Sequence, residues 1–419
     1  MFFKFSPFWH SVYTVVSGTV IAQAIPMIAL LALTRIVNTA DLGNFFLWFA
    51  ASSIPMLLAS ASIDKAIFLA DKYDDITNLL KLNFFISSIV ALLTFVIISV
   101  LKITGDSVVS DVIKDYAASF ATYSFIMSLQ KNLQSVIIYR SEFKLLNKSK
   151  LTLAGSVALG QLVTGLLGLG IKGLIYSTVL LSGLSTLLVM QWLNISFTKL
   201  CTSISLPTLK HTLLENYKFI VFSLPAELIN LVASQIPIFT ISARFGAVHV
   251  AMYSLVLRVM AVPIGLLGNS VLTVFKDQAA RDFREQGNCK YIYVKTLKYL
   301  SILSCLPFLL LYLFGHSAFK LLFGEEFGMA GEYASTLAIV YFFIFISSPL
   351  SYVLFFSDQG KLINLFSQIT YCLIVMFIFT YADSMDNAIF HYAIFGSVYY
   401  LIYLFLSYRT ALGFQPKNS

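Results

Sequence analysis

The sequence predicts an all-α integral membrane protein with 12 transmembrane helices, arranged as two parallel-repeat six-helix bundles around a central cavity. Hydrophobic residues make up 58% of the 419 residues and charged residues only 11%, whereas charged residues are about a quarter of an ordinary soluble domain. Apolar runs of about 20 residues, the length needed to cross the hydrocarbon core, recur along the chain. The first two runs are matched by two similar runs in the second half.

Twelve apolar runs can be counted, and their continuity excludes a β-barrel, whose strands alternate between lipid-facing and inward-facing residues. Nine runs lack Asp, Glu, Lys and Arg: 11–34, 42–63, 82–101, 151–171, 173–198, 299–319, 333–357, 362–382 and 387–408. Three runs contain one charged residue each: Lys131 in 116–139, Glu227 in 219–243 and Arg258 in 245–275. We therefore expect a multi-pass membrane protein.

The two halves of the chain share a pair of helices. Arg35 and Arg244 end the first helix of each pair, and Pro55 and Pro263 follow near the middle of the second. The separation from arginine to proline is 20 residues in the first copy and 19 in the second. Repeats of six spans each must enter the membrane in the same direction, so they are related by an axis along the membrane normal.

A connector between the sixth and seventh spans divides the predicted halves, which cover residues 1–205 and 206–419. Prolines inside the expected helices remove backbone hydrogen bonds and predict kinks; they are Pro26, Pro55, Pro237 and Pro263. Prolines at matching depths in repeated helices point to the binding cavity of a transporter. We expect the kinks at Pro55 and Pro263 to shape that cavity and to let the bundles rock against each other.

The distribution of Lys and Arg predicts the orientation. Twenty of the 28 lie in loops on one side of the expected membrane, and six lie in loops on the other. Because cytoplasmic loops carry the excess of positive charge, both termini should be cytoplasmic. This asymmetry also explains most of the net charge of +8, and nothing indicates nucleic acid binding. His and Cys show no metal-binding spacing, and no phosphate loop, nucleophile elbow or catalytic carboxylate pair was found, so neither a cofactor nor an enzymatic activity is predicted.

Charged residues inside spans are candidates for function, because each costs about 2.5–3.5 kcal/mol at the membrane centre on insertion scales. Lys131 and Arg258 have the sign needed to bind an anion in a water-lined cavity. The alternatives are a helix end for Lys131 and a snorkelling or paired side chain for Arg258. Glu227 could form a salt bridge to either residue or carry a proton, and Asp64 is a second candidate for ion coupling.

Other polar residues could complete the cavity. Arg35 and Arg244 lie at the expected outer face, where they either anchor their helices or form a gate or an anion contact. Gln23, Asn230 and Gln235 lie within spans and could hydrogen-bond sugar hydroxyls, although such side chains more commonly link helices.

Several short motifs resemble those of a known family. They are Ser17-Gly18 to Arg35, Asp41-Leu42-Gly43-Asn44-Phe45, Tyr139-Arg140-Ser141-Glu142-Phe143-Lys144, and Arg244-Phe245-Gly246 followed by Tyr253. They are similar to motifs of the polysaccharide-transport flippases, the O-antigen (Wzx-like) group of the multidrug/oligosaccharidyl-lipid/polysaccharide exporter superfamily. Ala251 departs from that family's usual glycine.

The resemblance implies a flippase that moves undecaprenyl-pyrophosphate-linked oligosaccharide, an O-antigen or capsule repeat unit, across the bacterial inner membrane by alternating access. It implies this lipid-linked substrate and membrane lipid as partners. The polysaccharide polymerase and the chain-length machinery are further candidate partners. A proton or sodium gradient is the candidate driving force.

Two alternatives remain open. A multidrug or cation antiporter of the same superfamily would need acidic residues in the membrane, and here Lys131 and Arg258 outnumber Glu227. A membrane O-antigen polymerase would need a large outer loop with catalytic residues, and no expected outer loop exceeds about a dozen and a half residues.

Overall fold

The computed structural model describes residues 7–68, 70, 73–104, 110–196, 198, 200 and 205–413. Within these ranges the regular structure is entirely helical. The chain divides into two compact units, residues 1–235 and 236–419. The boundary falls inside the helix α11 (Leu224–Phe245), so the two parts of this helix belong to different units.

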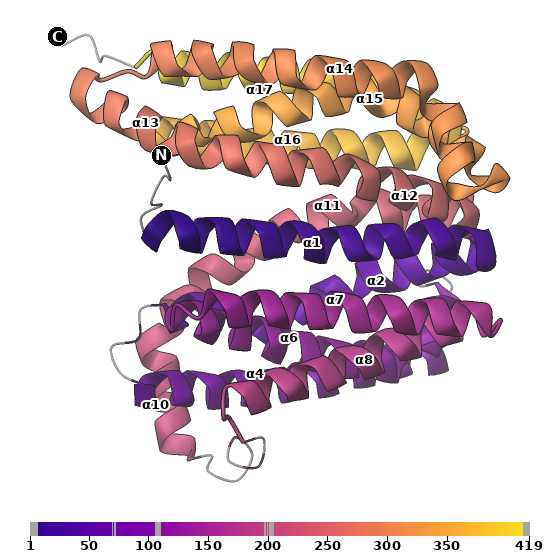
Figure 1. Cartoon of the computed structure of the whole chain (residues 1–419), viewed down its shortest axis with the longest axis vertical. Helices are drawn as coiled ribbons and strands as arrows, with labels where there is room; N and C mark the ends of the chain where they lie inside the picture. The colour runs from indigo at the N-terminus through magenta and orange to yellow at the C-terminus, as the bar shows by residue number, and fades with distance from the viewer. Residues whose placement is uncertain are drawn as a thin grey trace, which may run out of the picture. The chain divides into compact units, whose positions relative to one another are not determined.

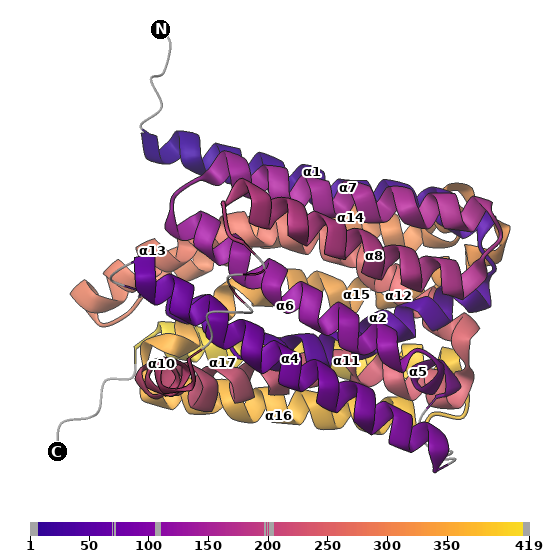
Figure 2. The same ribbon diagram turned by 90° about the horizontal axis from the view of Figure 1, so that it is seen from below.

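Unit 1 contains the helices up to the first part of α11, and within it the long helices run side by side (Figure 1). They are α1 (Pro7–Ile36), α2 (Thr39–Ser60), α3 (Ile63–Ile67), α4 (Tyr73–Ile103), α5 (Asp111–Asp115), α6 (Ala117–Tyr139), α7 (Phe143–Leu166), α8 (Gly170–Trp192), α10 (Leu206–Lys218) and the π-helical turn η1 (Phe219–Ser223). The short helix α10 runs across the long ones. Helix α1 packs along α7, and α4 packs along α6 (Figure 2).

Unit 2 contains the remaining helices. They are α12 (Ala247–Pro263), the π-helical turn η2 (Ile264–Gly268), α13 (Asn269–Gln286), α14 (Lys290–Phe323), η3 (Glu325–Phe327), α15 (Gly328–Leu350), η4 (Ser351–Phe356), α16 (Asp358–Tyr381) and α17 (Met385–Ala411). Helix α15 packs against both α14 and α17, and α16 packs against α17.

Each of the 12 predicted spans overlaps in sequence with a helix of the structure. Within the described part of the chain, nine helices are long and apolar enough to cross a membrane: Ser17–Ile36, Thr39–Ser60, Asp74–Ile103, Gly170–Trp192, Glu227–Phe245, Lys290–Phe323, Glu325–Phe356, Asp358–Tyr381 and Met385–Ala411. These nine do not include α6 and α7, which have 23 and 24 residues, or the shorter apolar α12. The all-α membrane class is confirmed, and the count of 12 spans stays a prediction.

Several helices differ in extent from the apolar runs that predict them. The fifth span was predicted over 151–171, but α7 covers Phe143–Leu166 and therefore begins among charged residues. Backbone groups near the membrane must stay hydrogen-bonded, so a helix continues past the end of its apolar run. One basic side chain of that first part has a partner on another helix: the Nζ of Lys150 donates to the Oγ1 of Thr19 on α1 at 3.0 Å.

Turns between helices use residues suited to them. Asn38 caps α2 by accepting a hydrogen bond from the backbone nitrogen of Ala40 at 2.8 Å, which satisfies one of the free donors at the start of a helix. Between α7 and α8 the chain reverses through Gly168 and Gly170, whose φ values are 67° and 53°. Glycine adopts this left-handed conformation without steric cost.

The cores of the two units rely on aromatic and small residues. In unit 1, the fully buried Trp48 donates from Nε1 to the Oγ of Ser119 at 2.9 Å. The centroids of the Trp48 and Tyr123 rings are 5.1 Å apart. In unit 2, α14 and α15 approach closely at Gly315 and Gly331. Small residues permit such close approach between helices in a membrane.

The kinks at the four prolines stay predictions, and the helices differ at these positions. Helices α1 and α2 remain α-helical through Pro26 and Pro55, and α11 remains so through Pro237. At Pro263, α12 ends and the π-helical turn η2 begins. A change in hydrogen-bond register of this kind is a recognised cause of bending. The rocking role of Pro55 and Pro263 stays a prediction.

Replacing Gly331 with alanine should destabilise unit 2. A Cβ atom at this position would lie 2.5 Å from the carbonyl oxygen of Gly315 and 2.6 Å from the Cα of His316, so α14 and α15 would have to separate. Overpacking of this kind costs about 1–3 kcal/mol. Thermal unfolding in detergent should therefore show a lower Tm. The control is Gly155→Ala in α7, where a Cβ meets no atom within 4 Å; equal stability of the two variants would contradict the prediction.

Candidate functional site

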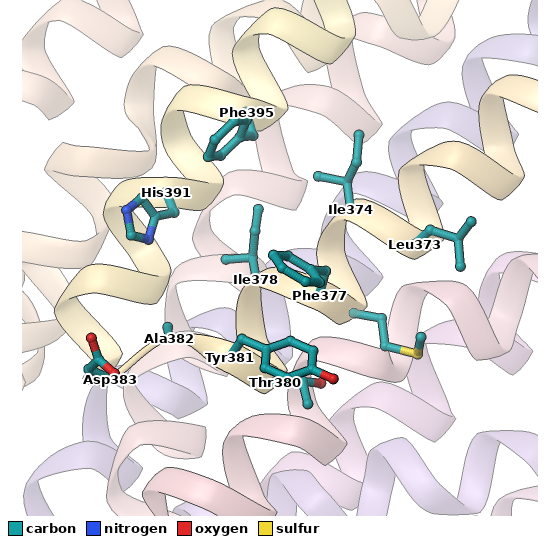
Figure 3. A pocket seen from close by; sticks show the side chains of 11 residues that line it. Leu373, Ile374, Phe377, Ile378, Thr380, Tyr381, Ala382, Asp383, His391 and Phe395 are labelled. Atoms are coloured by element: carbon teal, nitrogen blue, oxygen red, sulfur yellow. The ribbon is translucent and has the colours of Figure 1, made fainter.

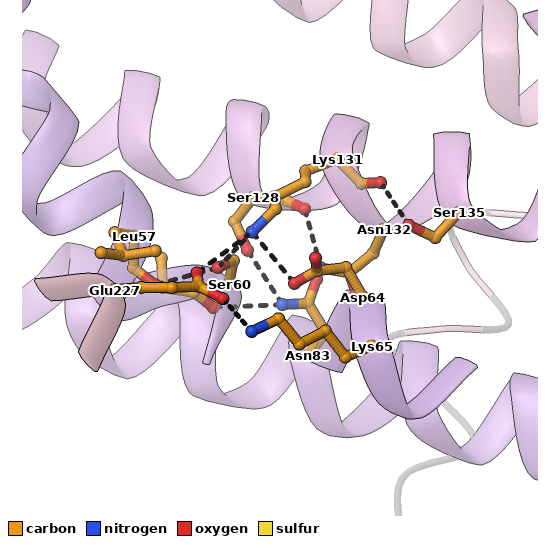
Figure 4. Close-up of polar contacts among 11 residues, drawn as sticks. Leu57, Ser60, Asp64, Lys65, Asn83, Ser128, Lys131, Asn132, Ser135 and Glu227 are labelled. Carbon is orange, nitrogen blue, oxygen red and sulfur yellow. Dashed lines mark hydrogen bonds and ion pairs between the residues drawn. The ribbon is translucent and has the colours of Figure 1, made fainter. Parts of the chain in front are cut away.

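Four charged side chains from three helices meet in unit 1 (Figure 4). The Nζ of Lys131 on α6 lies 3.0 Å from the Oδ1 of Asp64 on α3 and 3.9 Å from the Oε2 of Glu227 on α11. The other carboxylate oxygen of Glu227, Oε1, pairs with the Nζ of Lys65 on α3. Two positive and two negative charges therefore form one neutral cluster, which we call the charged cluster.

A sharp turn places Asp64 and Lys65 in the cluster. Helix α2 ends at Ser60, and Ala61 and Ser62 both adopt left-handed backbone conformations, with φ values of 50° and 53°. These two residues therefore form a turn before α3 begins at Ile63.

The apolar side of α3 holds the turn against α6. Ile63, Ala66 and Ile67 are buried in one hydrophobic core cluster with Leu133 and Val136 of α6. This packing fixes the neighbouring polar side of α3 close to the lysine of α6.

The members of the charged cluster differ in accessibility. Asp64 has the most buried side chain, 14% exposed, and Glu227 is 29% exposed, whereas the two lysines are 37% and 42% exposed. The Oδ1 of Asp64 is within ion-pair distance of the lysine but makes no hydrogen bond of good geometry. Partly exposed ion pairs of this kind contribute about 0–1 kcal/mol each. The cluster is therefore better suited to exchange of partners than to adding stability.

A buried polar layer supports the cluster. The Nδ2 of Asn83 on α4 donates to the carbonyl oxygen of Ala59 at 3.1 Å and to the Oγ of Ser128 at 2.9 Å. The Nδ2 of Asn132 donates to the carbonyl oxygen of Ser128 at 3.0 Å, and the Nζ of Lys131 lies 3.5 Å from the Oγ of Ser60. These bonds join α2, α4 and α6 beneath the charges.

Sequence reasoning identified three of the four charged residues but not the supporting layer. In the sequence Lys65 is one of the 20 basic residues in the expected cytoplasmic loops, and Asn83 lies at the edge of an apolar run, where an amide is unremarkable. One signal was present in α6: Ser124, Ser128, Lys131 and Ser135 are separated by four, three and four residues. That spacing places them on one face of a helix.

The other predicted site residues lie elsewhere in unit 1. Arg35 is exposed in the last turn of α1, and Gln23 is exposed on the same helix. Asn230 is exposed on α11, and the Nε2 of Gln235 donates to the Oγ of its neighbour Ser234 at 3.1 Å. The structure does not bring these residues into the charged cluster, so a role in sugar binding stays a prediction for them.

Two predicted arginines lie in unit 2. Arg258 is half-buried on α12. The Nη1 of Arg244 donates to the carbonyl oxygens of Thr380 and Ala382, the latter at 2.9 Å. Its guanidinium group thus binds carbonyl oxygens at the end of α16, where a helix leaves its last carbonyls without partners in the helix, as expected for an arginine that anchors a helix terminus. The proposed gate or anion contact at this position remains a prediction.

Unit 2 also contains an apolar cavity of about 920 Å³ between α16 and α17 (Figure 3). Leu373, Phe377 and Phe395 contribute to its lining, and Asp383 and His391 are among its few polar residues. None of the predicted site residues lines it. Such a lining is suited to hydrocarbon chains more than to a charged ligand.

Comparison with known proteins identifies the family. A model for a family described as polysaccharide biosynthesis protein matches residues 32–331. The chain belongs to this family. The matched region contains all four residues of the charged cluster, and the membership confirms the resemblance seen in the sequence. A search of curated proteins gave no match.

Solved structures of similar fold also cover nearly the whole chain. An inward-facing multidrug resistance MATE family transporter of the MOP superfamily aligns with a TM-score of 0.69 and 14% identity. The alignment covers 93% of the present chain and 94% of the MATE transporter. The lipid II flippase MurJ in an inward closed conformation aligns with a TM-score of 0.71 and 11% identity, covering 94% and 87%. At these identities the likeness shows the fold alone: this multi-pass membrane protein has a fold similar to those of the MATE family transporter and of MurJ.

Proposed function

We propose that the protein is a flippase for undecaprenyl-pyrophosphate-linked oligosaccharide in the bacterial inner membrane, working by alternating access with both termini in the cytoplasm. The observation that carries the proposal is the family match over residues 32–331. The protein belongs to a polysaccharide biosynthesis family and has a fold similar to those of transporters. Transport of a polysaccharide precursor best accounts for this combination. The moving parts would be the two predicted halves, 1–205 and 206–419.

The charged cluster supports an anionic substrate. Lys131 and Lys65 expose more than a third of their side chains, so both residues are accessible from solvent. Charge-assisted hydrogen bonds from lysine to phosphate oxygens are among the stronger polar interactions. The head group of a lipid-linked sugar could therefore bind here while its hydrocarbon tail stays in the bilayer.

One observation favours an antiporter as the second candidate. In the predicted spans two cations, Lys131 and Arg258, outnumber the single acid Glu227, which disfavours an antiporter. In the structure the charged cluster contains two acids, Asp64 and Glu227, and two cations, Lys65 and Lys131. Within the cluster cations therefore no longer outnumber acids. A cation antiporter whose carboxylates exchange a proton or sodium ion for a drug is consistent with the same residues.

Deletion of the gene in its host tests the two candidates together. A flippase defect should cause a lipid-linked oligosaccharide to accumulate in the cytoplasmic leaflet, because synthesis continues while transport stops. The accumulated lipid can be identified by mass spectrometry, and a plasmid copy of the wild-type gene should remove it. If no lipid-linked oligosaccharide accumulates and the deletion strain is more sensitive to cationic drugs, the flippase proposal is contradicted and the antiporter is supported.

A further inference from the structure

The two lysines of the charged cluster are already neutralised by carboxylates of the same chain. An anionic ligand that binds Lys65 or Lys131 must therefore replace an internal partner or bind beside it. Because the cluster has a net charge of zero, electrostatic attraction of a further anion would be weak unless one carboxylate moves away. The question is which carboxylate can leave.

Asp64 is built into its position. It lies on α3, next to Ile63 and Ala66, which are 2% and 1% exposed in the core of unit 1. Its carboxylate is the more buried of the two, with an Oδ1 atom inaccessible to solvent. Moving the backbone of Asp64 away from α6 would take Ile63 and Ala66 out of that core.

Glu227 is held less firmly. It lies in the first turn of α11, which follows the π-helical turn η1 and contains Pro225. Proline and π-helical turns both interrupt the regular hydrogen bonds of a helix, so the backbone here is easier to move than that of α3. The side chain of Glu227 is also twice as exposed as that of Asp64, at 29% against 14%.

The contacts of Glu227 resemble those of a phosphate. One carboxylate oxygen faces the Nζ of Lys65 and the other faces the Nζ of Lys131 at 3.9 Å (Figure 4). Two neighbouring oxygens of one anion thus bridge two ammonium groups. A pyrophosphate group can make the same bridge with more charge and more acceptor oxygens.

We propose that Glu227 is an exchangeable counter-ion, which the pyrophosphate group of the substrate displaces from Lys65 and Lys131. This inference rests on the proposed function for the choice of ligand. Displacement frees the first turn of α11 from α3 and α6, while Asp64 stays paired with Lys131. Substrate binding is thereby linked to the release of α11 from its ion pairs in unit 1.

Binding of inorganic pyrophosphate to the purified full-length protein tests the exchange. In Glu227→Gln the internal competitor is neutral, so pyrophosphate should bind about three- to tenfold more tightly than to wild type, given two partly exposed ion pairs. The matched control is Glu215→Gln on α10, which removes one negative charge from an ion pair with His211 elsewhere in unit 1. Its affinity should equal that of wild type. Isothermal titration calorimetry in phosphatidylcholine nanodiscs gives the dissociation constants.

Several results would overturn the inference. These are weaker or unchanged binding by Glu227→Gln, an equal gain in Glu215→Gln, or no binding of pyrophosphate by any form. If Glu227→Gln does not fold, Glu227→Asp replaces it; its shorter side chain competes less well, so a smaller gain in affinity is expected and an unchanged affinity would count against exchange. Loss of binding when phosphatidylglycerol is added to the nanodiscs would assign the site to membrane phospholipid and overturn the choice of ligand.

The outcome separates this inference from the proposed function. Calorimetry reports anion exchange at the cluster without requiring transport. The expected gain in affinity without accumulation of lipid-linked oligosaccharide in the deletion strain would support exchange and reject the flippase. Accumulation of lipid-linked oligosaccharide without a gain in the affinity of Glu227→Gln for pyrophosphate would support the flippase and reject exchange.

Discussion

Replacing Lys131 with glutamine is expected to reduce glycan export by about 10- to 100-fold at normal amounts of protein in the membrane. A hydrogen bond from a charged group contributes about 1.5–3 kcal/mol, and each 1.4 kcal/mol corresponds to a factor of ten. Glutamine is close to lysine in size but has no charge, so the loss reports the missing ammonium group. Export can be measured as the amount of glycan that reaches the outer surface, normalised to transporter in isolated membranes.

The same substitution also leaves Asp64 without its ion-pair partner. Breaking a fully buried pair costs about 3–5 kcal/mol; for this pair, in which Lys131 is 37% exposed, roughly 1–2 kcal/mol is a better estimate of the lost stability. A lower Tm for Lys131→Gln would therefore be no evidence about substrate binding.

The double variant Lys131→Gln/Asp64→Asn separates the two effects. It removes both charges, so stability should return towards that of wild type, while export should stay low because the cation is still missing. Recovery of both stability and export would show that Lys131 serves only to neutralise Asp64. Failure to recover stability would show that the pair is not what makes the single variant unstable.

The sequence predicts the membrane class well because the bilayer imposes a length and a composition on each helix. The helix ends are less predictable. Charges mark the edge of the hydrocarbon region, but a helix such as α7 continues beyond that edge to keep its backbone hydrogen-bonded. The start at Phe143 and the contact of Lys150 with α1 follow from packing between helices, which no single apolar run contains.

The site was predictable only in part for a similar reason. Lys131 and Glu227 stand out because a charge is rare in an apolar helix. Their partners depend on the turn at Ala61 and Ser62, whose left-handed conformations are unusual for residues other than glycine. Arg244 shows the same limit, since its bonds to the end of α16 join residues more than 130 positions apart.

Arg258 should be as important for export as Lys131. It is half-buried on α12, where the preceding residues Val250 to Val256 are all buried. A cation on such a helix has a substantial cost of membrane insertion. Charges in membrane helices are therefore usually functional. We expect Arg258→Ala to reduce export by about tenfold or more, on the same scale of charged hydrogen bonds, and Arg258→Lys to be partly active because it keeps the charge.

The control for Arg258 is Arg284→Ala, which removes an arginine from an exposed position on α13 in the same unit. It should export normally, since a solvated charge on a helix surface contributes little. All variants need equal amounts of protein in the membrane and a measured Tm. Wild-type export by Arg258→Ala would contradict a role of this residue in substrate binding. Equal loss in the alanine and lysine variants would show instead that the planar guanidinium group is required, because only arginine offers paired donors to a phosphate.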